Sequence, residues 1–365
     1  MKTFDDDIQS QTIEWLRFAL AVLVVALHTS MEAGLALTGG VSQVCRIVIC
    51  ELGSIAVPAF FLVSGYFFFS GMQEWSWSKY KSKVLKRCKT ILLPYLLWCI
   101  IALIFGFCWA WLHDGTLCLG DFWTSKGGLG AFWNGSTCES SSNIFGYRIY
   151  EGKPIDGPLW YIRDLFVICL LAPLWHKYIK VLKVPGLLLL AALLIMNIWF
   201  PFTGFCIRGV FFFCLGAYFM ITGKHFIDVF RRYERTSYIV SGLLFIPLVL
   251  LYGKESVSLG CLCRIFTIVG VVAIFNLAYR LVSSGEVKYR PALSNSSFFI
   301  YALHAIVVLD LSNFVLWRLL PFENELVFTL KVFLRPALAV GICLGIFFLM
   351  RRFMPRTLSL LTGNH

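Results

Sequence analysis

Apolar residues dominate the chain in long runs that alternate with short polar segments. Ten of these runs approach the roughly 20 residues that an α-helix needs to cross the hydrocarbon core of a bilayer. They cover residues 13–33, 47–69, 88–112, 158–175, 184–200, 205–221, 238–252, 262–281, 298–317 and 329–350. Runs of this length do not fit a β-barrel, whose strands are shorter and alternate in polarity. The pattern predicts an all-α integral membrane protein, built as a bundle of about ten transmembrane helices.

Positive charge is unevenly distributed between these runs. Most of the lysine and arginine lies after every second run, at 79–89, 177–183, 224–235, 288–290 and 351–356, whereas the other gaps are sparser. Cytoplasmic loops of membrane proteins carry such an excess of positive charge. We therefore expect both termini to be cytoplasmic, in the inner membrane of a bacterium. The position of the charge relative to the lipid bilayer then explains the net charge of +12, and no nucleic-acid partner is expected.

The overall composition agrees with a membrane protein. Hydrophobic residues make up 59% of the chain and charged residues 14%, with a mean hydropathy of +0.78, whereas a soluble domain has about 25% charged residues. The acidic start lacks the basic region of a signal peptide, so we expect the first helix to be retained. Without an appended polar stretch or an internal repeat, residues 1–365 are predicted to form one polytopic domain with a long outer loop at about 113–157. Cys118 and Cys138 lie in this loop and could pair in an oxidising compartment.

The first apolar run begins and ends with an ionisable residue. It reads RFALAVLVVALH, from Arg17 to His28. Eleven helical steps separate these two residues by about 16 Å and leave them within about 20° of one helix face. An ionisable group at membrane depth is costly and indicates function, so His28 is a candidate catalytic residue. Arg17 could bind a ligand, or it could extend to the inner headgroups, paired with Glu14.

Other ionisable residues gather toward the predicted outer ends of the runs. They are Glu51, Arg163, Asp164, Arg208, Arg264, Asp310 and Arg335, with His304 near mid-membrane. This set is expected for a water-accessible cavity that opens outward. Several could instead be interfacial anchors, and His304 could be a structural histidine. Since Arg163 and Asp164 are adjacent, we expect them to point to different sides of their helix, so mutual neutralisation alone is a poor explanation for the pair.

A basic segment precedes the third run. It reads KYKSKVLKRCKTILLPY and includes Lys86, Arg87 and Lys89. Such a segment attracts anionic lipid headgroups. Lysine, arginine and a helix N-terminus could equally hold the phosphates of a nucleotide. The residues alone leave both interpretations open.

Five segments together resemble the membrane acyltransferase-3 family, which includes O-acetyltransferases of bacterial surface polysaccharides. RFALAVLVVALH has the arginine, ten residues and histidine of its first helix, and VPAFFLVSGYFFF resembles its second. KRCKTILLPYLLW, GPLWYIRDLFVICLLAPL and SNSSFFIYALHAIVV resemble the third, fourth and ninth. The resemblance extends over nearly the whole chain. It implies transfer of an acyl group, most simply acetyl, from cytoplasmic acyl-CoA to a hydroxyl of an envelope or exported saccharide or a lipid-linked glycan.

The resemblance also implies roles for individual residues. His28 takes the place of the essential family histidine, as general base or acyl relay, and Arg17 that of the family arginine. Lys86, Arg87 and Lys89 occupy the place of a basic motif that binds the donor, although lysines stand at the spacing where relatives often have Arg-x-x-Arg. We expect Arg163 and Asp164 to support the oxyanion or the acceptor. The remaining candidates, for acceptor contact, are Trp160, His304 and Glu51.

Two other classes of protein compete with this hypothesis. A transporter or flippase for glycans or lipid-linked sugars would use the same cavity but leave its substrate chemically unchanged. A scaffolding subunit would not need the pair of His28 and Arg17. Besides acyl-CoA as co-substrate, the sequence implies no metal, and it does not determine the acceptor or the oligomeric state.

Overall fold

The computed structural model describes residues 4–31, 40–113, 115, 118–252, 256–322 and 324–363. Helices form most of this chain. In the first half they are α1 (Phe4–Met31), α2 (Val41–Gly53), α3 (Ala56–Phe68), α4 (Trp77–Arg87), α5 (Leu93–His113), α6 (Leu119–Ser125), α7 (Ala131–Asn134) and α8 (Trp160–Leu170). In the second half they are α9 (Ala172–Met196), α10 (Ile207–Ile221), α11 (Phe226–Arg231), α12 (Glu234–Leu250), α13 (Val257–Ser283), α14 (Pro291–Leu303), α15 (Leu309–Leu319), α16 (Glu325–Phe353) and α17 (Pro355–Thr362). Two π-helical turns, η1 (Cys88–Leu92) and η4 (His304–Val308), join α4 to α5 and α14 to α15.

Seven helical segments of the described chain are long and apolar enough to cross a membrane. They are Ile8–Ser30, Val41–Phe68, Trp77–His113, Ala172–Met196, Val257–Ser283, Pro291–Leu319 and Glu325–Phe353. Helix α10 is apolar but shorter, with 15 residues. The protein is therefore mainly α-helical and multi-pass, as predicted. The number of ten spans stays a prediction.

The two apolar runs predicted at 158–175 and 184–200 do not have the same boundaries as the helices of the structure. Helix α8 ends at Leu170, and after one intervening residue α9 runs from Ala172 to Met196. Helix α9 is kinked at Lys183, where φ is 47° and ψ is −129°, two residues before Pro185. Proline has no N–H to donate and its ring crowds the preceding turn, which bends a helix at this place. The boundary between the two predicted spans is therefore a kink.

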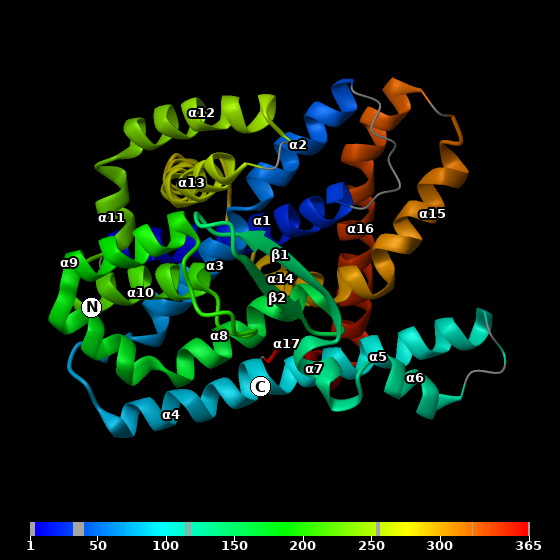
Figure 1. The fold of residues 1–365 in the computed structure, drawn as a ribbon, viewed down its shortest axis with the longest axis horizontal. Helices are drawn as coiled ribbons and strands as arrows, with labels where there is room; N and C mark the ends of the chain where they lie inside the picture. The colour runs from blue at the N-terminus through cyan, green and yellow to red at the C-terminus, as the bar shows by residue number, and fades with distance from the viewer. Residues whose placement is uncertain are drawn as a thin grey trace.

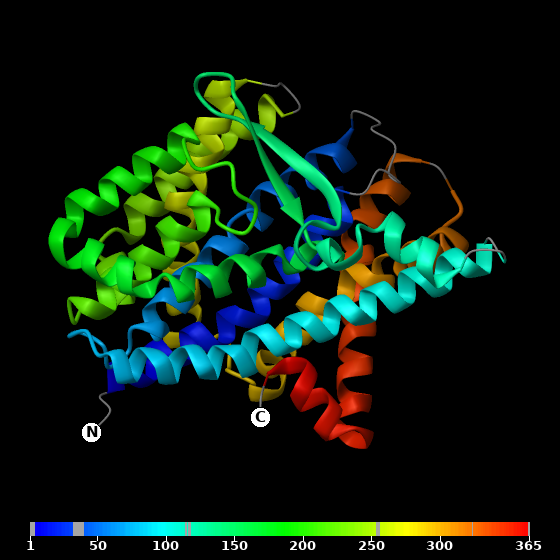
Figure 2. The same cartoon turned by 60° about the horizontal axis from the view of Figure 1, so that its bottom comes forward.

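Helix α1 forms the centre of the bundle. It packs against α2, α3, α13, α14 and α16 (Figures 1 and 2). Its apolar face is buried through Leu16, Leu20, Val24 and Val25. This central position places the stripe from Arg17 to His28 between packed helices.

Helices α3 and α10 cross at two glycines. A Cβ atom at Gly65 would lie 2.0 Å from the carbonyl oxygen of Phe213, and one at Gly216 would lie 2.0 Å from that of Leu62. Only glycine allows the two backbones to approach this closely. The crossing fixes α10, whose first turn contributes to the site described below.

The predicted outer loop folds into short helices and a β-hairpin, which the all-α prediction did not include. Strand β1 (Ser136–Ser142) pairs antiparallel with β2 (Arg148–Lys153). The hairpin lies along the upper edge of the molecule in Figure 2, and α17 lies at the lower edge with the start of α1. The described parts of the chain closest to the two ends therefore lie on the same side, opposite the hairpin.

The predicted pairing of Cys118 with Cys138 stays a prediction. The thiol of Cys118 is exposed and donates a hydrogen bond to the Asp121 carboxylate at 2.9 Å. The side chain of Cys138 lies outside the described residues.

Candidate active site

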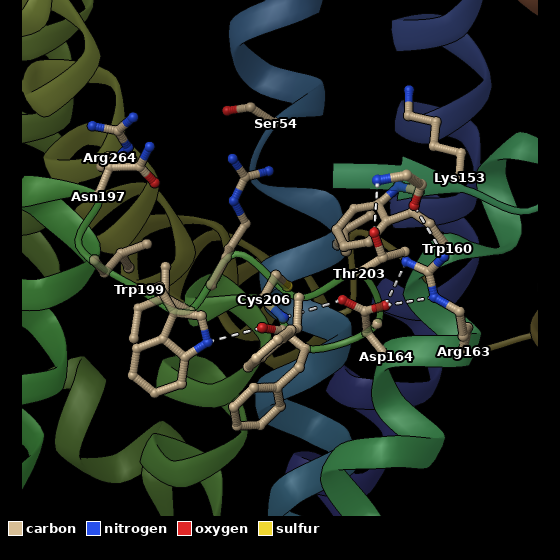
Figure 3. A pocket seen from close by; sticks show the side chains of 18 of the residues that line it. Ser54, Lys153, Trp160, Arg163, Asp164, Asn197, Trp199, Thr203, Cys206 and Arg264 are labelled. Carbon is tan, nitrogen blue, oxygen red and sulfur yellow. Dashed lines mark hydrogen bonds and ion pairs between the residues drawn. The ribbon is translucent and has the colours of Figure 1, made fainter. Parts of the chain in front are cut away.

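A cavity of about 470 Å³ lies between the C-terminal end of α1, α8, the connection from α9 to α10, and α13 (Figure 3). We name it the hairpin-side cavity because Gly152 and Lys153 of β2 form part of its wall. Its charged or imidazole-bearing lining residues are His28, Lys153, Arg163, Asp164, Arg208 and Arg264. The sequence predicts an outward-opening cavity around five of these six, and the structure brings them together.

His28 contacts His304, which is fully buried behind it. The Nδ1 atom of His304 lies 3.1 Å from the carbonyl oxygen of Ile300, so this nitrogen carries the proton and Nε2 accepts. The Nδ1 atom of His28 lies 2.9 Å from the carbonyl oxygen of Val24 and 3.2 Å from His304 Nε2, both acceptors. In the neutral pair, Nδ1 of His28 therefore carries the proton, and its Nε2 has the lone pair that a general base needs.

Arg163 and Asp164 form an ion pair that fastens the hairpin to the helices. Arg163 donates from Nε and Nη2 to Asp164 Oδ1 at 3.0 and 2.8 Å. Its Nη1 donates to the carbonyl oxygens of Trp133 and Gly152 at 2.5 and 2.9 Å. Asp164 Oδ2 in turn accepts from the backbone N–H of Cys206, just before α10.

The expectation that these neighbours point apart is wrong. Adjacent side chains leave a helix about 100° apart, but the Arg163 guanidinium is long enough to fold back onto the Asp164 carboxylate. Four of its five N–H groups are thereby used. The pair is almost completely buried, with 3% and 2% of the side chains exposed. Its geometry defines an anchor, and a role toward an oxyanion stays a prediction.

The predicted acceptor residues fall in three different environments. Trp160 lines the hairpin-side cavity. His304 does not line it and contacts His28 from behind. Glu51 lines neither this cavity nor the second one described below.

Asp156 is a buried carboxyl that sequence reasoning missed. It lies between β2 and α8, and neither of its carboxyl oxygens has a hydrogen-bond partner among the described residues. Burial raises the pKa of the Asp156 carboxyl well above its ordinary value. Burial therefore favours the neutral form of this side chain.

A second cavity of about 690 Å³ lies on the other side of the protein. We name it the termini-side cavity because Glu14 and Arg17 of α1 and Thr362 and Gly363 at the end of α17 line it. Arg17 is paired with Glu14 at 3.2 Å, and its side chain is 42% exposed. The pairing and the cavity contact, which the sequence left as alternatives, therefore occur together.

The basic segment contributes two of its three candidate residues to this cavity. Lys86 and Arg87 line it, whereas Lys89 is exposed outside it. The reason is η1, which begins at Cys88 and inserts a wider π-helical turn between the end of α4 at Arg87 and the start of α5. A turn of this kind shifts the helix face and often occurs at functional sites. The i,i+3 spacing of Lys86 and Lys89 consequently does not place both side chains on one face.

The last helix closes one wall of the termini-side cavity. The indole N–H of Trp98 donates to the carbonyl oxygen of Leu361 at 2.9 Å. Gly363 ends α17 with φ of 69°, and a Cβ atom there would lie 2.3 Å from the carbonyl oxygen of Thr90 in η1. Helix α17 is thus packed tightly against the turn that follows Lys86 and Arg87.

Tyr301 lines both cavities. It is buried, and its hydroxyl donates to the carbonyl oxygen of Pro158. Tyr161, whose ring lies 5.9 Å from that of Tyr301, and Ser64 line the termini-side cavity beside it. Tyr301 therefore separates the two cavities, and His28 lies on the hairpin side of this boundary.

Sequence reasoning did not single out Tyr301 or Lys153 as part of this site, whereas Arg264 was among the residues expected to line it. A signal existed for Tyr301, which precedes His304 by three residues and so shares its helix face. Lys153 and Arg264 come from separate elements, and only the folded chain brings them to one cavity.

These features define a multi-pass membrane protein with two polar cavities that meet at one buried residue. Residues 11–352 match a family described as an acyltransferase domain, and the chain belongs to this membrane acyltransferase-3 family. It is 25% identical to the succinoglycan biosynthesis protein ExoH of Rhizobium meliloti (strain 1021) over 325 residues, which cover 86% of this chain and 80% of that protein. No solved structure matches the chain.

The family establishes the class of reaction. The protein is an acyltransferase that transfers groups other than aminoacyl groups, and its seven apolar helices make it a multi-pass membrane enzyme. The family also implies an acyl donor. In the described part of the chain, no three His, Cys, Asp or Glu side chains are grouped so that they could hold a metal ion.

Proposed function

We propose that the protein is an O-acyltransferase of the bacterial inner membrane, folded as one domain over residues 1–365 with both termini in the cytoplasm. It moves an acyl group, most simply acetyl, from cytoplasmic acyl-CoA to a hydroxyl of an envelope or exported saccharide. The observation that carries the proposal is the position of His28. Its imidazole lines the hairpin-side cavity next to Tyr301, the residue that also lines the termini-side cavity.

The termini-side cavity fits the donor. Lys86, Arg87 and Arg17 line it. Neither Lys86 nor Arg87 makes a hydrogen bond or ion pair with another described residue. Lysine and arginine bind phosphate groups directly, so these side chains suit the phosphates of coenzyme A. The pantetheine arm then extends along α1 toward His28, over about 16 Å of helix.

The chemistry needs a base at the end of this path. His28 Nε2 takes the proton of the acceptor hydroxyl while the oxygen attacks the thioester carbonyl carbon. The tetrahedral intermediate collapses, the C–S bond breaks, and the proton passes from His28 to the departing thiolate. In the relay variant, His28 attacks first and an acyl-imidazole transfers the group to the hydroxyl. Arg163 and Asp164 hold the hairpin over the reacting groups, and the remaining Arg163 N–H is available to an oxyanion.

The hairpin-side cavity fits the acceptor. Its wall includes Trp160 and Trp199, and indole rings stack well on the apolar faces of sugar rings. The similar protein is named for the biosynthesis of succinoglycan, a polysaccharide. A saccharide acceptor agrees with both observations.

Label transfer by the purified protein tests this proposal. The protein receives radiolabelled acetyl-CoA with and without an envelope glycan extract, as wild type, as His28→Ala and as His113→Ala, a control at the exposed end of α5. We expect alkali-labile label on the glycan, which identifies an oxygen ester, and a loss of about 10²- to 10⁴-fold in His28→Ala alone. Alkali-stable label would indicate an amide instead. If the wild type neither hydrolyses the donor, labels itself nor transfers label, the transporter or flippase hypothesis takes precedence.

A further inference from the structure

The charged side chains among the described residues that line the hairpin-side cavity are mainly cationic. Four of them are cations, Lys153, Arg163, Arg208 and Arg264, and only Asp164 is a carboxylate. Asp164 is bound by Arg163 through two hydrogen bonds. The carboxylate of the cavity is therefore committed to one of the four cations.

Arg208 is the most available of these cations. It lies in the first turn of α10, its side chain is exposed, and it makes no hydrogen bond or ion pair with another described residue. The N-terminal end of a helix adds partial positive charge at the same place. Arg264 reaches the cavity from α13 and donates to the carbonyl oxygen of Ile195 at the end of α9.

The positions of these cations make a purely anchoring role a poor explanation. The three cations other than Arg163 come from β2, α10 and α13, which are distant in the sequence, and Figure 3 shows Arg264 on the opposite side of the view from Lys153. They also lie on the side where the charge distribution predicts the outer face, and positive charge is normally depleted there. A cationic cavity in this position favours a ligand with negative charge.

We infer that the hairpin-side cavity binds a substrate that carries a carboxylate, with Arg208 and Arg264 as the residues that bind it. This inference rests on the proposed function and specifies its substrate class. The carboxylate has two possible sources, an acidic sugar of the acceptor or the free end of a dicarboxylic acyl group on the donor. Arginine suits either source because its planar fork matches the two oxygens of a carboxylate.

Kinetics with paired substrates test the inference. Acetyl-CoA is compared with succinyl-CoA, and the glycan extract with the same extract after its carboxyl groups are reduced to alcohols. Arg208→Gln and Arg264→Gln are expected to lower kcat/KM for the charged substrate about tenfold more than for its neutral counterpart. Arg208→Lys is expected to lose less activity than Arg208→Gln, because the charge remains although the planar fork is lost, and Arg318→Gln, on the exposed face of α15, is the matched control. A selective loss with succinyl-CoA places the carboxylate on the acyl group, and one with the untreated glycan places it on the acceptor.

Equal losses with charged and neutral substrates, or the same selective loss in Arg318→Gln, would overturn the inference. A binding measurement separates its failure from failure of the proposed function. Sodium succinate is expected to raise the melting temperature of His28→Ala protein more than neutral succinamide does at equal ionic strength. Arg208→Gln combined with Arg264→Gln should remove this difference. If succinate and succinamide act alike, the cavity does not bind carboxylate, whether or not the wild type transfers acyl groups.

Discussion

The Arg163–Asp164 pair of the hairpin-side cavity and the side chains of Lys86 and Arg87 in the termini-side cavity are held in opposite ways. On the hairpin side, Arg163 and Asp164 are buried and bound to each other and to the backbone around them. On the termini side, Lys86 and Arg87 line the wall without a hydrogen bond or ion pair to another described residue. A reacting hydroxyl must be placed within a fraction of an ångström of its base, which needs fixed neighbours. Phosphates need only nearby positive charge, so flexible side chains are sufficient there.

The strongest way to break the fixed side is Asp164→Ala. This change leaves the buried Arg163 guanidinium without its carboxylate and removes the acceptor for the Cys206 N–H. We expect a loss of about 3–5 kcal/mol in the free energy of unfolding, measured as a lower melting temperature in detergent. Asp310→Asn is the control, because it removes a carboxylate on the exposed face of α15. A fully stable Asp164→Ala protein would show that the ion pair does not anchor the hairpin.

On the hairpin side, the buried Asp156 carboxyl makes the stability of the protein depend on pH. Burial raises the pKa of this carboxyl in the folded protein well above the value of about 4 that it has in the unfolded chain. The folded state then binds the extra proton, so this group makes the protein less stable as the pH rises. The penalty grows by about 1.4 kcal/mol per pH unit until the folded-state pKa is reached.

Asp156→Asn removes this proton linkage. We expect the melting temperature of the variant to exceed that of the wild type by an amount that increases between about pH 5 and pH 7. A constant difference across this range would mean that Asp156 is ionised in the folded protein.

Substitutions at His304 test whether this residue positions His28 or contacts the substrate. His304→Leu removes one of the two acceptors for the Nδ1–H group of His28 and leaves only the carbonyl oxygen of Val24, so the imidazole is held less firmly in its orientation. We expect kcat to fall about 30-fold, with KM for both substrates little changed, because a lost orienting hydrogen bond acts on the base. His304→Gln restores an acceptor and should recover part of kcat. A rise in KM for the acceptor instead would return His304 to the acceptor-binding role predicted from the sequence.

The smallest effects are expected on the flexible side. Lys86→Gln and Arg87→Gln should each raise KM for acyl-CoA about five- to tenfold with little change in kcat, and the difference should shrink at high salt. Lys89→Gln is the matched control, since its side chain lies outside the cavity. An equal rise in KM for Lys89→Gln would show that the basic segment acts as a general electrostatic surface.

Local sequence properties predicted the helical architecture and the stripe of ionisable residues from Arg17 to His28. The apolar runs fall on helices because the length of a run of consecutive apolar residues can be read directly from the sequence. The stripe from Arg17 to His28 follows from helix geometry alone and needs no knowledge of neighbouring helices. It connects the two cavities, with Arg17 lining one and His28 the other.

The rest depended on tertiary structure. The π-helical turn at Cys88 is not encoded by residue spacing, and it separates Lys89 from Lys86. The fold-back of Arg163 onto Asp164 depends on side-chain length and burial, which helix periodicity ignores. The contact between His28 and His304 joins residues 276 positions apart, so no local pattern could reveal it.

Helix α17 lies beyond residue 352, where the match to the family ends, and yet Thr362 and Gly363 form part of the termini-side cavity. A wall of the cavity that we assign to the donor is therefore supplied by chain outside the shared family segment. In evolutionary terms, a relative can reshape this wall by altering its last helix while the helices that carry His28 and Arg17 stay the same. Under the proposed function, donor selection and catalysis would then be carried by different parts of the chain.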